Sequence, residues 1–522
     1  MPDSLLQASE ISQSRIKSFM RGAAVDFGGT GLLMVLGFII TPITLSYLNP
    51  TSYGFWMTIQ QVVGMLGLLE MGASIVVTQR VANPTLANDH TALSRFMSSC
   101  VAVQLGTAVI VAFLGFVLQT RLFLWFKISE AEAPGSTVAY KLMVAWFAVS
   151  IVLSLLPAIL AARQKMGLAN GINITVQLIS VVTVVPFLAV GLSIMSFPVA
   201  QWLAGIIGFT LATYLVRKVA PPFKLKMSLL SKASIKGVLS FSLYNWLAKI
   251  AFMLLMASDN IIIASTLGAA SVTPYLLTSR LAGMFGPNMA KLSSSSMAGF
   301  SELYATKNYE RLQVAALALV KFSARVACFG ASVVIFCSER FITLWVGAQY
   351  FAGSLFILLL GALCYRDTII RGIGTIILAS GDMRVTSMLT MVESLSKIVL
   401  VLFFIKIMHL GLVGVVLGQL IPTLLISGLY FPLKICKLTT LSLHHFFYHG
   451  ILFLTLKSAP TALVIMTLNY LVPNTWKWGG LFMILFAGVF TNLVSFEGPV
   501  LLKSSGLPLK QRLKLAFNPY KA

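Results

Sequence analysis

Long apolar runs separated by short polar segments dominate the sequence. A helix that crosses the hydrocarbon core of a membrane needs about 20 mostly apolar residues. Runs of that length predict fourteen transmembrane helices, which in chain order are 25–48, 54–79, 96–119, 138–161, 169–191, 194–216, 237–263, 270–290, 314–337, 351–379, 386–408, 411–432, 450–472 and 479–501. The pattern is typical of an all-α polytopic membrane protein.

The longest polar connection, 217–236, separates the sixth predicted helix from the seventh and is rich in Lys, Arg and Pro. We interpret it as a basic cytoplasmic linker between an N-terminal six-helix lobe, 1–216, and a C-terminal six-helix lobe, 237–432. Two extra helices and a basic cytoplasmic tail occupy 433–522.

The two predicted lobes share a faint repeat. A shift of 219 residues places Leu48 and Ser52 on Leu267 and Ser271, at equivalent points of the lobes. Because six helices return the chain to the same side, both lobes have one orientation. This predicts a parallel pseudo-repeat, an arrangement in which transporters place the substrate between the lobes.

Composition excludes the soluble classes. Of 522 residues, 58% are hydrophobic and 10% are charged. Globular domains contain about 45–50% apolar and about 25% charged residues, and disordered chains are less apolar still. The chain nevertheless carries a formal charge of +23.

Most of that positive charge indicates how the chain is oriented in the membrane. With the N-terminus placed in the cytoplasm, the cytoplasmic segments hold 24 Lys and Arg, the opposite side holds 6, and 8 lie within predicted helices. This asymmetry predicts cytoplasmic termini and gives no reason to expect nucleic acid as a partner. The first residues contain no apolar signal-peptide core, so the first helix is expected to direct insertion.

No pattern predicts catalysis. The five cysteines are scattered, so neither a metal site nor a disulfide framework is expected. His444, His445 and His449 are close in sequence but lack further ligands, which favours an interfacial loop. No phosphate-binding P-loop occurs, and no long outer loop is available for an active site. We therefore expect no enzyme activity and no cofactor.

Ionisable residues inside the predicted helices are the candidate site, because such residues are costly in a membrane and usually face a cavity or a partner. The C-terminal lobe has an excess of cations over the acids Asp259, Asp367 and Glu393. The cations are Lys249, Arg280, Lys321, Arg325, Arg366, Arg371 and Lys397. We expect a cationic substrate cavity formed by Arg280, Arg325, Lys249, Lys321, Arg366 and Arg371, which suits a phosphate-bearing or acidic substrate.

Other interpretations of these charges remain open. Asp367 with Arg371, and Glu393 with Lys397, have the i,i+4 spacing of helix ion pairs and can neutralise themselves. Lys321 and Arg325 have the same spacing but equal charge, so they require an anion from elsewhere. Unrelated cations that snorkel to the lipid surface would also explain the excess.

Three stretches resemble a known family. Leu48-Asn-Pro-Thr-Ser-Tyr-Gly-Phe-Trp56 followed by Leu68-Leu-Glu-Met-Gly-Ala73 resembles the signature of the polysaccharide-unit flippases, a turn "L-G-P-x-x-Y-G" before a run ending in "D-x-G". Asn49 replaces the usual Gly, and Glu70 replaces the usual Asp. Leu267-Gly-Ala-Ala-Ser-Val-Thr-Pro-Tyr275 is similar to the turn of the second lobe, and Gly411-Leu-Val-Gly-Val-Val-Leu-Gly418 to the start of helix twelve.

The resemblance implies a bacterial inner-membrane protein of the multidrug/oligosaccharidyl-lipid/polysaccharide exporter superfamily. It implies a flippase that moves undecaprenyl-pyrophosphate-linked oligosaccharide units to the periplasmic leaflet by alternating access, for O-antigen (lipopolysaccharide) or capsule synthesis. The pathway's polymerase and glycosyltransferases are the implied partners. Coupling to a proton or sodium gradient is also implied, with Asp26, Glu70 and Asp259 as candidate carriers.

Two other functions compete with this expectation. A drug/cation antiporter of the same superfamily would require an acidic cavity. The excess of cations in the C-terminal lobe disfavours this alternative. An integral-membrane polysaccharide polymerase or ligase would need an outward-facing catalytic loop, and no long one is predicted.

Overall fold

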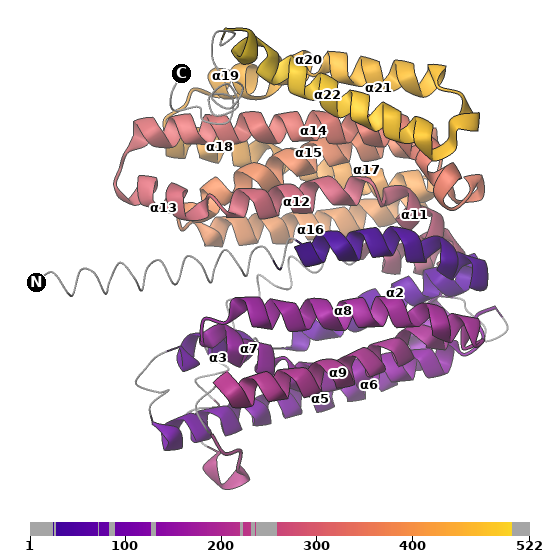
Figure 1. Ribbon diagram of the computed structural model, residues 1–522, viewed down its shortest axis with the longest axis vertical. Helices are drawn as coiled ribbons and strands as arrows, with labels where there is room; N and C mark the ends of the chain where they lie inside the picture. The colour runs from indigo at the N-terminus through magenta and orange to yellow at the C-terminus, as the bar shows by residue number, and fades with distance from the viewer. Residues whose placement is uncertain are drawn as a thin grey trace, which may run out of the picture. The chain divides into compact units, whose positions relative to one another are not determined.

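The computed structural model describes residue 25 and residues 28–70, 73–82, 89–126, 132–219, 223–230, 235 and 258–503. Within these residues every regular element is a helix and no strand occurs, which confirms the predicted all-α class. The chain forms two compact units, Met1–Val272 and Thr273–Ala522, which are described separately (Figure 1). The proposed division into two lobes, a linker and a tail stays a prediction, because parts of the linker and most of the predicted helix that follows it, 237–263, lie outside the described residues.

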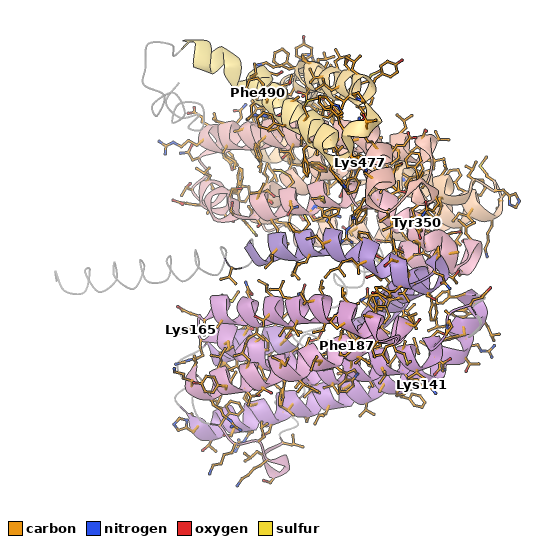
Figure 2. All side chains as sticks on the ribbon, turned by 45° about the vertical axis from the view of Figure 1, so that its right-hand side comes forward. Lys141, Lys165, Phe187, Tyr350, Lys477 and Phe490 are labelled. Carbon is orange, nitrogen blue, oxygen red and sulfur yellow. The ribbon has the colours of Figure 1, made fainter. Side chains whose placement is uncertain are left out.

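Unit 1, Met1–Val272, is a helical bundle in which α5 packs against α6 and α8 against α9. Its elements are the helix Gly28–Tyr47, α2 (Pro50–Leu66), η1 (Gly67–Leu69), α3 (Ala73–Val81), α5 (His90–Phe126), α6 (Ser136–Leu153), α7 (Leu155–Ala162), α8 (Met166–Ala189), η2 (Ser193–Met195), α9 (Ser196–Val219), η3 (Met227–Leu229) and η4 (Ala269–Ser271). Lys141 and Lys165 lie at opposite ends of this bundle (Figure 2).

The signature turn starts α2. The Asn49 side chain caps the helix by accepting a hydrogen bond from Ser52 N at 2.7 Å, and Pro50 occupies the first turn, where its missing N–H costs nothing. Asn49 Nδ2 also donates to the carbonyl of Glu132 at 3.0 Å. Trp56 is buried and stacks on Phe197 of α9 with ring centroids 4.6 Å apart. Asn49 thus caps the helix with its side chain where the family's usual Gly has none.

Two interruptions lie inside spans that the sequence predicted as continuous. The predicted helix 54–79 is bent by 55° between Pro50–Leu69 and Ala73–Val81, and Glu70 directly follows the first segment. The predicted helix 138–161 is divided at Ser154 into α6 and α7. Pro157 contributes to this second break, because proline cannot donate the backbone hydrogen bond of a regular helix.

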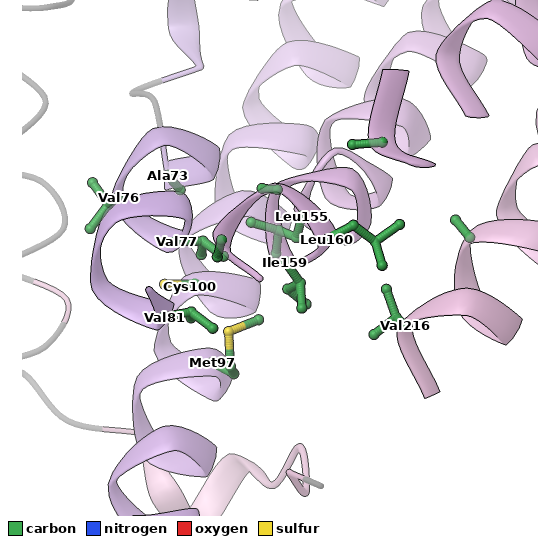
Figure 3. Close-up of a cluster of buried hydrophobic side chains, with 14 of the residues drawn as sticks. Ala73, Val76, Val77, Val81, Met97, Cys100, Leu155, Ile159, Leu160 and Val216 are labelled. Carbon is green, nitrogen blue, oxygen red and sulfur yellow. The ribbon is translucent and has the colours of Figure 1, made fainter. Parts of the chain in front are cut away.

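An apolar core holds the short segments α3 and α7 together. Val77 and Leu160 are fully buried in it, and Cys100 of α5 closes one side (Figure 3). Small residues permit close helix contacts elsewhere in unit 1. A side chain at Gly29, in the Gly-rich run of the first helix, would lie 2.3 Å from Ile174 Cδ1 of α8.

Unit 2, Thr273–Ala522, is built around α14 and α15, which pack along each other. Its elements are α11 (Val272–Ser279), α12 (Ala282–Ser294), α13 (Met297–Ala305), α14 (Tyr309–Trp345), η5 (Ala348–Tyr350), α15 (Ser354–Ala379), α16 (Met383–Lys406), α17 (Gly411–Leu425), α18 (Ser427–Thr439), α19 (Leu443–His445), the π-helical segment η6 (Phe446–Leu452), α20 (Phe453–Lys457), α21 (Ala459–Leu471), η7 (Asn474–Trp476) and α22 (Lys477–Lys503). Ala324, Ile373 and Phe446 are fully buried in its largest core cluster.

The predicted end of one helix in unit 2 is wrong. The helix predicted over 314–337 continues to Trp345, and Arg340 lies within it. Arg340 is only 8% exposed, and its Nη1 and Nη2 donate to the carbonyls of Val472 and Pro473 at 3.0 and 2.8 Å. Because these carbonyls accept hydrogen bonds from both terminal nitrogens of the guanidinium, the charged residue does not end the helix there.

The described residues contain ten helices that are long and apolar enough to cross a membrane, and an eleventh span if the bent pair Pro50–Leu69 and Ala73–Val81 counts as one. The predicted helix 270–290 is broken into α11 and α12. Most of the predicted helix 237–263 lies outside the described residues. The structure is therefore a multi-span membrane protein, and the number fourteen stays a prediction.

Candidate functional site

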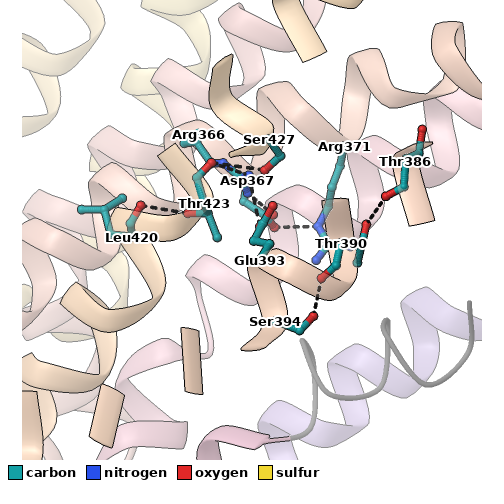
Figure 4. A network of polar contacts seen from close by, with 10 residues as sticks. All are labelled: Arg366, Asp367, Arg371, Thr386, Thr390, Glu393, Ser394, Leu420, Thr423 and Ser427. Carbon is teal, nitrogen blue, oxygen red and sulfur yellow. Dashed lines mark hydrogen bonds and ion pairs between the residues drawn. The ribbon is translucent and has the colours of Figure 1, made fainter. Parts of the chain in front are cut away.

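Unit 2 contains a buried network of charged side chains. Arg366 of α15 is 9% exposed, and its Nη2 lies 3.4 Å from Glu393 Oε1 of α16. Asp367 lies between two arginines: its Oδ1 is 3.6 Å from Arg366 Nη1, and its Oδ2 is 2.6 Å from Arg371 Nε (Figure 4). The expected Asp367–Arg371 helix pair is therefore formed, and Arg366 takes its second carboxylate from the neighbouring helix.

A helix break supplies a further acceptor. Pro422 lies near the end of α17, and α18 begins at Ser427 after a single intervening residue. The carbonyl of Thr423 accepts a hydrogen bond from Arg366 Nη2 at 2.9 Å and another from Ser427 Oγ at 3.2 Å. Carbonyls released by a break are satisfied here by side chains, as a membrane interior requires. Arg366 consequently joins α15, α16 and the α17–α18 break.

The network holds more positive than negative charge. Lys397, one turn beyond Glu393 on α16, is fully buried, and its charge acts on Glu393. Among the described residues of this network, Arg366, Arg371 and Lys397 are grouped with two carboxylates, Asp367 and Glu393, which leaves one positive charge in excess. A buried charge is tolerated only where partners and hydrogen bonds compensate it, so this cluster is tightly constrained.

Helix α12 passes over the Asp367–Arg371 pair at Gly286. A Cβ atom at this position would lie 2.5 Å from Asp367 Oδ2 and 3.1 Å from Arg371 Cδ. Only a glycine permits so close an approach without displacing a charged side chain. Gly286 therefore allows α12 to pack directly against the Asp367–Arg371 ion pair.

The remaining predicted cavity residues lie outside this network. Arg280 is exposed at the break between α11 and α12. Lys321 is exposed one turn before Arg325, whose Nε donates to Asn492 Oδ1 of α22 at 2.8 Å. The amide oxygen of Asn492 is neutral, so the anion that this like-charged pair was expected to need stays a prediction. Lys249 lies outside the described residues, so a single cavity containing all six cations stays a prediction.

A second polar cluster lies in unit 1, where the two broken spans meet α5. Gln104 of α5 is fully buried, and its Nε2 lies 3.3 Å from Glu70 Oε1, 3.2 Å from the carbonyl of Ile151 and 3.4 Å from Ser154 Oγ. Ser74 Oγ lies 3.4 Å from the same Glu70 oxygen. Of the three predicted ion carriers, Glu70 is therefore the one placed in a defined polar cluster.

The structure shows less of the surroundings of the other two candidate ion carriers, Asp26 and Asp259. Asp26 lies outside the described residues. Asp259 is 8% exposed near the start of the helical residues 258–267. Sequence analysis missed Gln104 and Ser154, because it considered ionisable residues only. The available signal was a single amide in the middle of the apolar run 96–119.

In the described part of the chain, no three His, Cys, Asp or Glu side chains are grouped so that they could hold a metal ion. The five cysteines are buried and unpaired. The polar clusters of both units contain only carboxylates, cations, amides, hydroxyls and carbonyls. These groups suit binding and charge compensation.

Comparison with solved structures defines the class. The lipid II flippase MurJ in an inward closed conformation matches 91% of this chain and 99% of its own, with a TM-score of 0.64 and 15% identity. An inward-facing multidrug resistance MATE family transporter of the MOP superfamily matches 80% of this chain and 99% of its own, with a TM-score of 0.62 and 15% identity. The fold is therefore that of the MOP superfamily transporters.

The sequence itself identifies the family. The profile of the family described as polysaccharide biosynthesis protein matches residues 19–290, just over half of the chain. The chain belongs to this family, which confirms the resemblance carried by the signature turns. No curated protein matches the chain significantly by sequence.

Proposed function

We propose that this protein is a flippase that moves undecaprenyl-pyrophosphate-linked oligosaccharide units across the bacterial inner membrane by alternating access. The main support is the combination of a polysaccharide biosynthesis family with a fold similar to that of the lipid II flippase. The units would serve surface polysaccharides such as O-antigen or capsule, and the pathway's polymerase and glycosyltransferases would act before and after this step.

The charge of unit 2 fits an anionic substrate. The buried network already carries one positive charge in excess, and Arg280 and Lys321 are exposed in addition. A diphosphate group is strongly attracted to such cations in a low-dielectric environment. A drug/cation antiporter of the same fold would instead require a net acidic site, so the cation excess favours the flippase.

An ion gradient is the proposed energy source, because the chain belongs to a transporter fold and unit 1 holds a carboxylate inside a membrane span. Glu70 is the proposed carrier with the best-defined surroundings. Asp259 and Asp26 are weaker candidates. Downhill ion movement would return the empty transporter to the cytoplasm-facing state.

The decisive experiment locates the lipid-linked unit in a deletion strain. A flippase defect leaves the complete unit in the cytoplasmic leaflet, where it is inaccessible to periplasmic enzymes in intact cells. A polymerase or ligase defect leaves it in the periplasmic leaflet. Periplasmic accumulation in the deletion strain would refute the flippase proposal.

Substitutions then test the cationic site in complementation assays with expression controls. Arg280→Ala should abolish complementation, because it removes an exposed cation without opening the buried network. For Arg325, the matched variant is Asn492→Ala, which removes its partner but leaves the charge. Loss of function in Arg325→Ala alone supports a role in substrate binding, whereas equal loss in both variants indicates a structural role.

A further inference from the structure

A pocket opens in unit 2 between α14 and α21, near the C-terminal ends of both helices. Its volume is about 980 Å³, which lies within the usual range of about 300–1,000 Å³ for ligand sites. The polar residues that line it are Glu339, Arg340 and Thr343 of α14 and Thr467, Asn469 and Tyr470 of α21. None of the described members of the charged network around Arg366 lines this pocket, so the two are separate sites.

Glu339 brings a carboxylate to this pocket from a helix long enough to cross a membrane. The residue is exposed, and no described residue forms an ion pair with it. The neighbouring Arg340 is directed to the turn after α21, where its Nη1 and Nη2 donate to the carbonyls of Val472 and Pro473. A charged group on a transmembrane helix usually faces a partner or a ligand. The carboxylate is therefore available to a positively charged ligand.

Arg340 places a fixed positive charge in the wall of the same pocket. The residue is only 8% exposed, and the two carbonyls that accept its hydrogen bonds carry no net charge. A Cβ atom at Gly480 of α22 would lie 2.7 Å from its Nη2, so α22 packs closely on the guanidinium. The pocket thus combines an accessible negative charge with a buried positive charge, and it suits a ligand that carries both.

Two polar atoms of the residues that line the pocket lack partners. No described residue accepts a hydrogen bond from Arg340 Nε or donates one to Asn469 Oδ1, although both atoms are buried. Most buried polar atoms in proteins have a partner from the protein or from a bound molecule. Hydrogen bonding at the polar end of the pocket is therefore incomplete within the described residues.

The polarity of the pocket changes along its two helices. A helix rises about 1.5 Å per residue, so Glu339 lies about 9 Å from the end of α14 at Trp345. Phe336 is about one turn deeper than Glu339, and Met466 is about one turn deeper than Tyr470, which lies near the end of α21. The pocket is thus apolar toward the middle of the helices and polar toward their ends. An amphiphilic molecule has the same distribution of polarity.

The pocket lies where the surface of a membrane is expected. The apolar run that predicted this span ends at 337, just before Glu339. The 37 residues of α14 extend about 55 Å, beyond a hydrocarbon core about 30 Å thick. Trp476 and Trp478 are 57% and 38% exposed and flank Lys477 at the start of α22 (Figure 2), and tryptophan is enriched at membrane interfaces. The polar end of the pocket therefore lies at the level of lipid headgroups.

We propose that this pocket binds a phospholipid of the phosphatidylethanolamine type, whose headgroup carries a primary amine beside a phosphate. The ammonium group donates hydrogen bonds to Glu339. The phosphate accepts hydrogen bonds from the hydroxyls of Thr343 and Thr467 in the field of Arg340, and the acyl chains follow the apolar end at Phe336. An anionic phospholipid without an amine would be repelled by Glu339, and a free sugar has no apolar part for the deep end of the pocket. Binding of this lipid does not depend on the proposed transport function.

Binding is tested on the delipidated, purified full-length protein by lipid titration and native mass spectrometry. Phosphatidylethanolamine should occupy one saturable site about tenfold more tightly than phosphatidylcholine, whose methylated amine donates no hydrogen bond, or phosphatidylglycerol, which has no amine. Glu339→Gln should remove this preference. Glu302→Gln on α13 is the matched control, because Glu302 is also exposed but does not line the pocket. Unfolding temperatures verify that each variant folds.

Two further measurements test the pocket and the need for a whole lipid. Ala348→Trp fills the pocket while retaining Glu339, and it should weaken phosphatidylethanolamine binding by about tenfold. Phosphoethanolamine, which is the same headgroup without acyl chains, should not displace the lipid at equal concentration, because it leaves the apolar end of the pocket empty. Equal affinities for the three lipids, equal phosphatidylethanolamine binding in Glu339→Gln and wild type, unchanged binding in Ala348→Trp, or displacement by phosphoethanolamine would overturn the proposal.

Discussion

The polar cluster of unit 1 and the charged network of unit 2 stabilise buried charged groups by different interactions. Both place charged groups beside helix breaks inside an apolar bundle. In unit 2, three cations share two carboxylates, and Arg366 is held by Glu393, Asp367 and the Thr423 carbonyl. In unit 1, the Gln104 amide lies 3.3 Å from the Glu70 carboxylate and 3.2 Å from the Ile151 carbonyl, which also accepts a hydrogen bond from Ser154 Oγ at 2.7 Å. Ion pairs therefore join the described residues of the network in unit 2, whereas hydrogen bonds from an amide and hydroxyls join those of the cluster in unit 1.

The difference lies in the kind of interaction. An ion pair depends on net charge, so the loss of one carboxylate leaves buried cations uncompensated. A hydrogen bond between neutral groups and one carboxylate is exchanged for another at a lower cost.

The largest effect is expected for Glu393→Gln in unit 2. The substitution raises the excess positive charge of the network by one and leaves Arg366 and Lys397 buried without this carboxylate. Losing one partner of a buried ion pair lowers the free energy of unfolding by about 3–5 kcal/mol. The fall in unfolding temperature of the detergent-purified protein measures it. Adding Lys397→Met to Glu393→Gln restores the original net charge and should recover part of the stability. An unchanged unfolding temperature in Glu393→Gln would show that the network is not constrained by charge.

A smaller loss is expected for Gly286→Ala. The new Cβ would lie 2.5 Å from Asp367 Oδ2, and overpacking of this kind costs about 1–3 kcal/mol. Gly283→Ala on the same helix is the control, because no atom lies within 4 Å of its Cβ position. Equal unfolding temperatures for the two variants would contradict the close approach of α12 to the ion pair.

Glu70→Gln in unit 1 should change stability by less than about 1.5 kcal/mol, because it exchanges one side chain that accepts a hydrogen bond from Gln104 for another. The same substitution that is severe at position 393 is thus expected to be mild at position 70. Parallel thermal unfolding of the two variants measures the contrast. A loss at Glu70 as large as that at Glu393 would show that the clusters do not differ in kind.

The smallest effect concerns Asp382, which precedes α16 and accepts a hydrogen bond from Lys434. This hydrogen bond lowers the pKa of Asp382 below its ordinary value of 3.8. A carboxyl group with a lowered folded-state pKa stabilises the protein above its unfolded-state pKa, and this contribution is lost as the pH falls through the folded-state pKa. Wild type should therefore exceed Asp382→Asn slightly in unfolding temperature at pH 7, and the difference should shrink steadily as the pH falls below 3.8. A difference that persists in acid would contradict this pairing.

Several features were accessible from the sequence because they depend on local chemistry. Apolar runs predicted most of the spans, and the i,i+4 spacing of Asp367 and Arg371 predicted their ion pair. The turn around Asn49 and Pro50 indicated a helix start. By contrast, neither the Glu393 partner of Arg366 nor the Asn492 partner of Arg325 could be predicted, since each lies on another helix. The helix end near residue 337 was misplaced for the same reason, because Arg340 is satisfied by carbonyls 132 and 133 residues away.

The sequence by itself determined the membrane class, the charge asymmetry and the family signature, since each follows from residue type and spacing along the chain. Only the tertiary structure decided which ionisable groups compensate one another. Compensation depends on distances between helices, and these arise from packing at positions such as Gly286 and from breaks such as those at Glu70, Ser154 and Ile426. The structure thereby joined Arg366, Asp367, Arg371 and Glu393 into one network and placed Glu70 beside an uncharged glutamine.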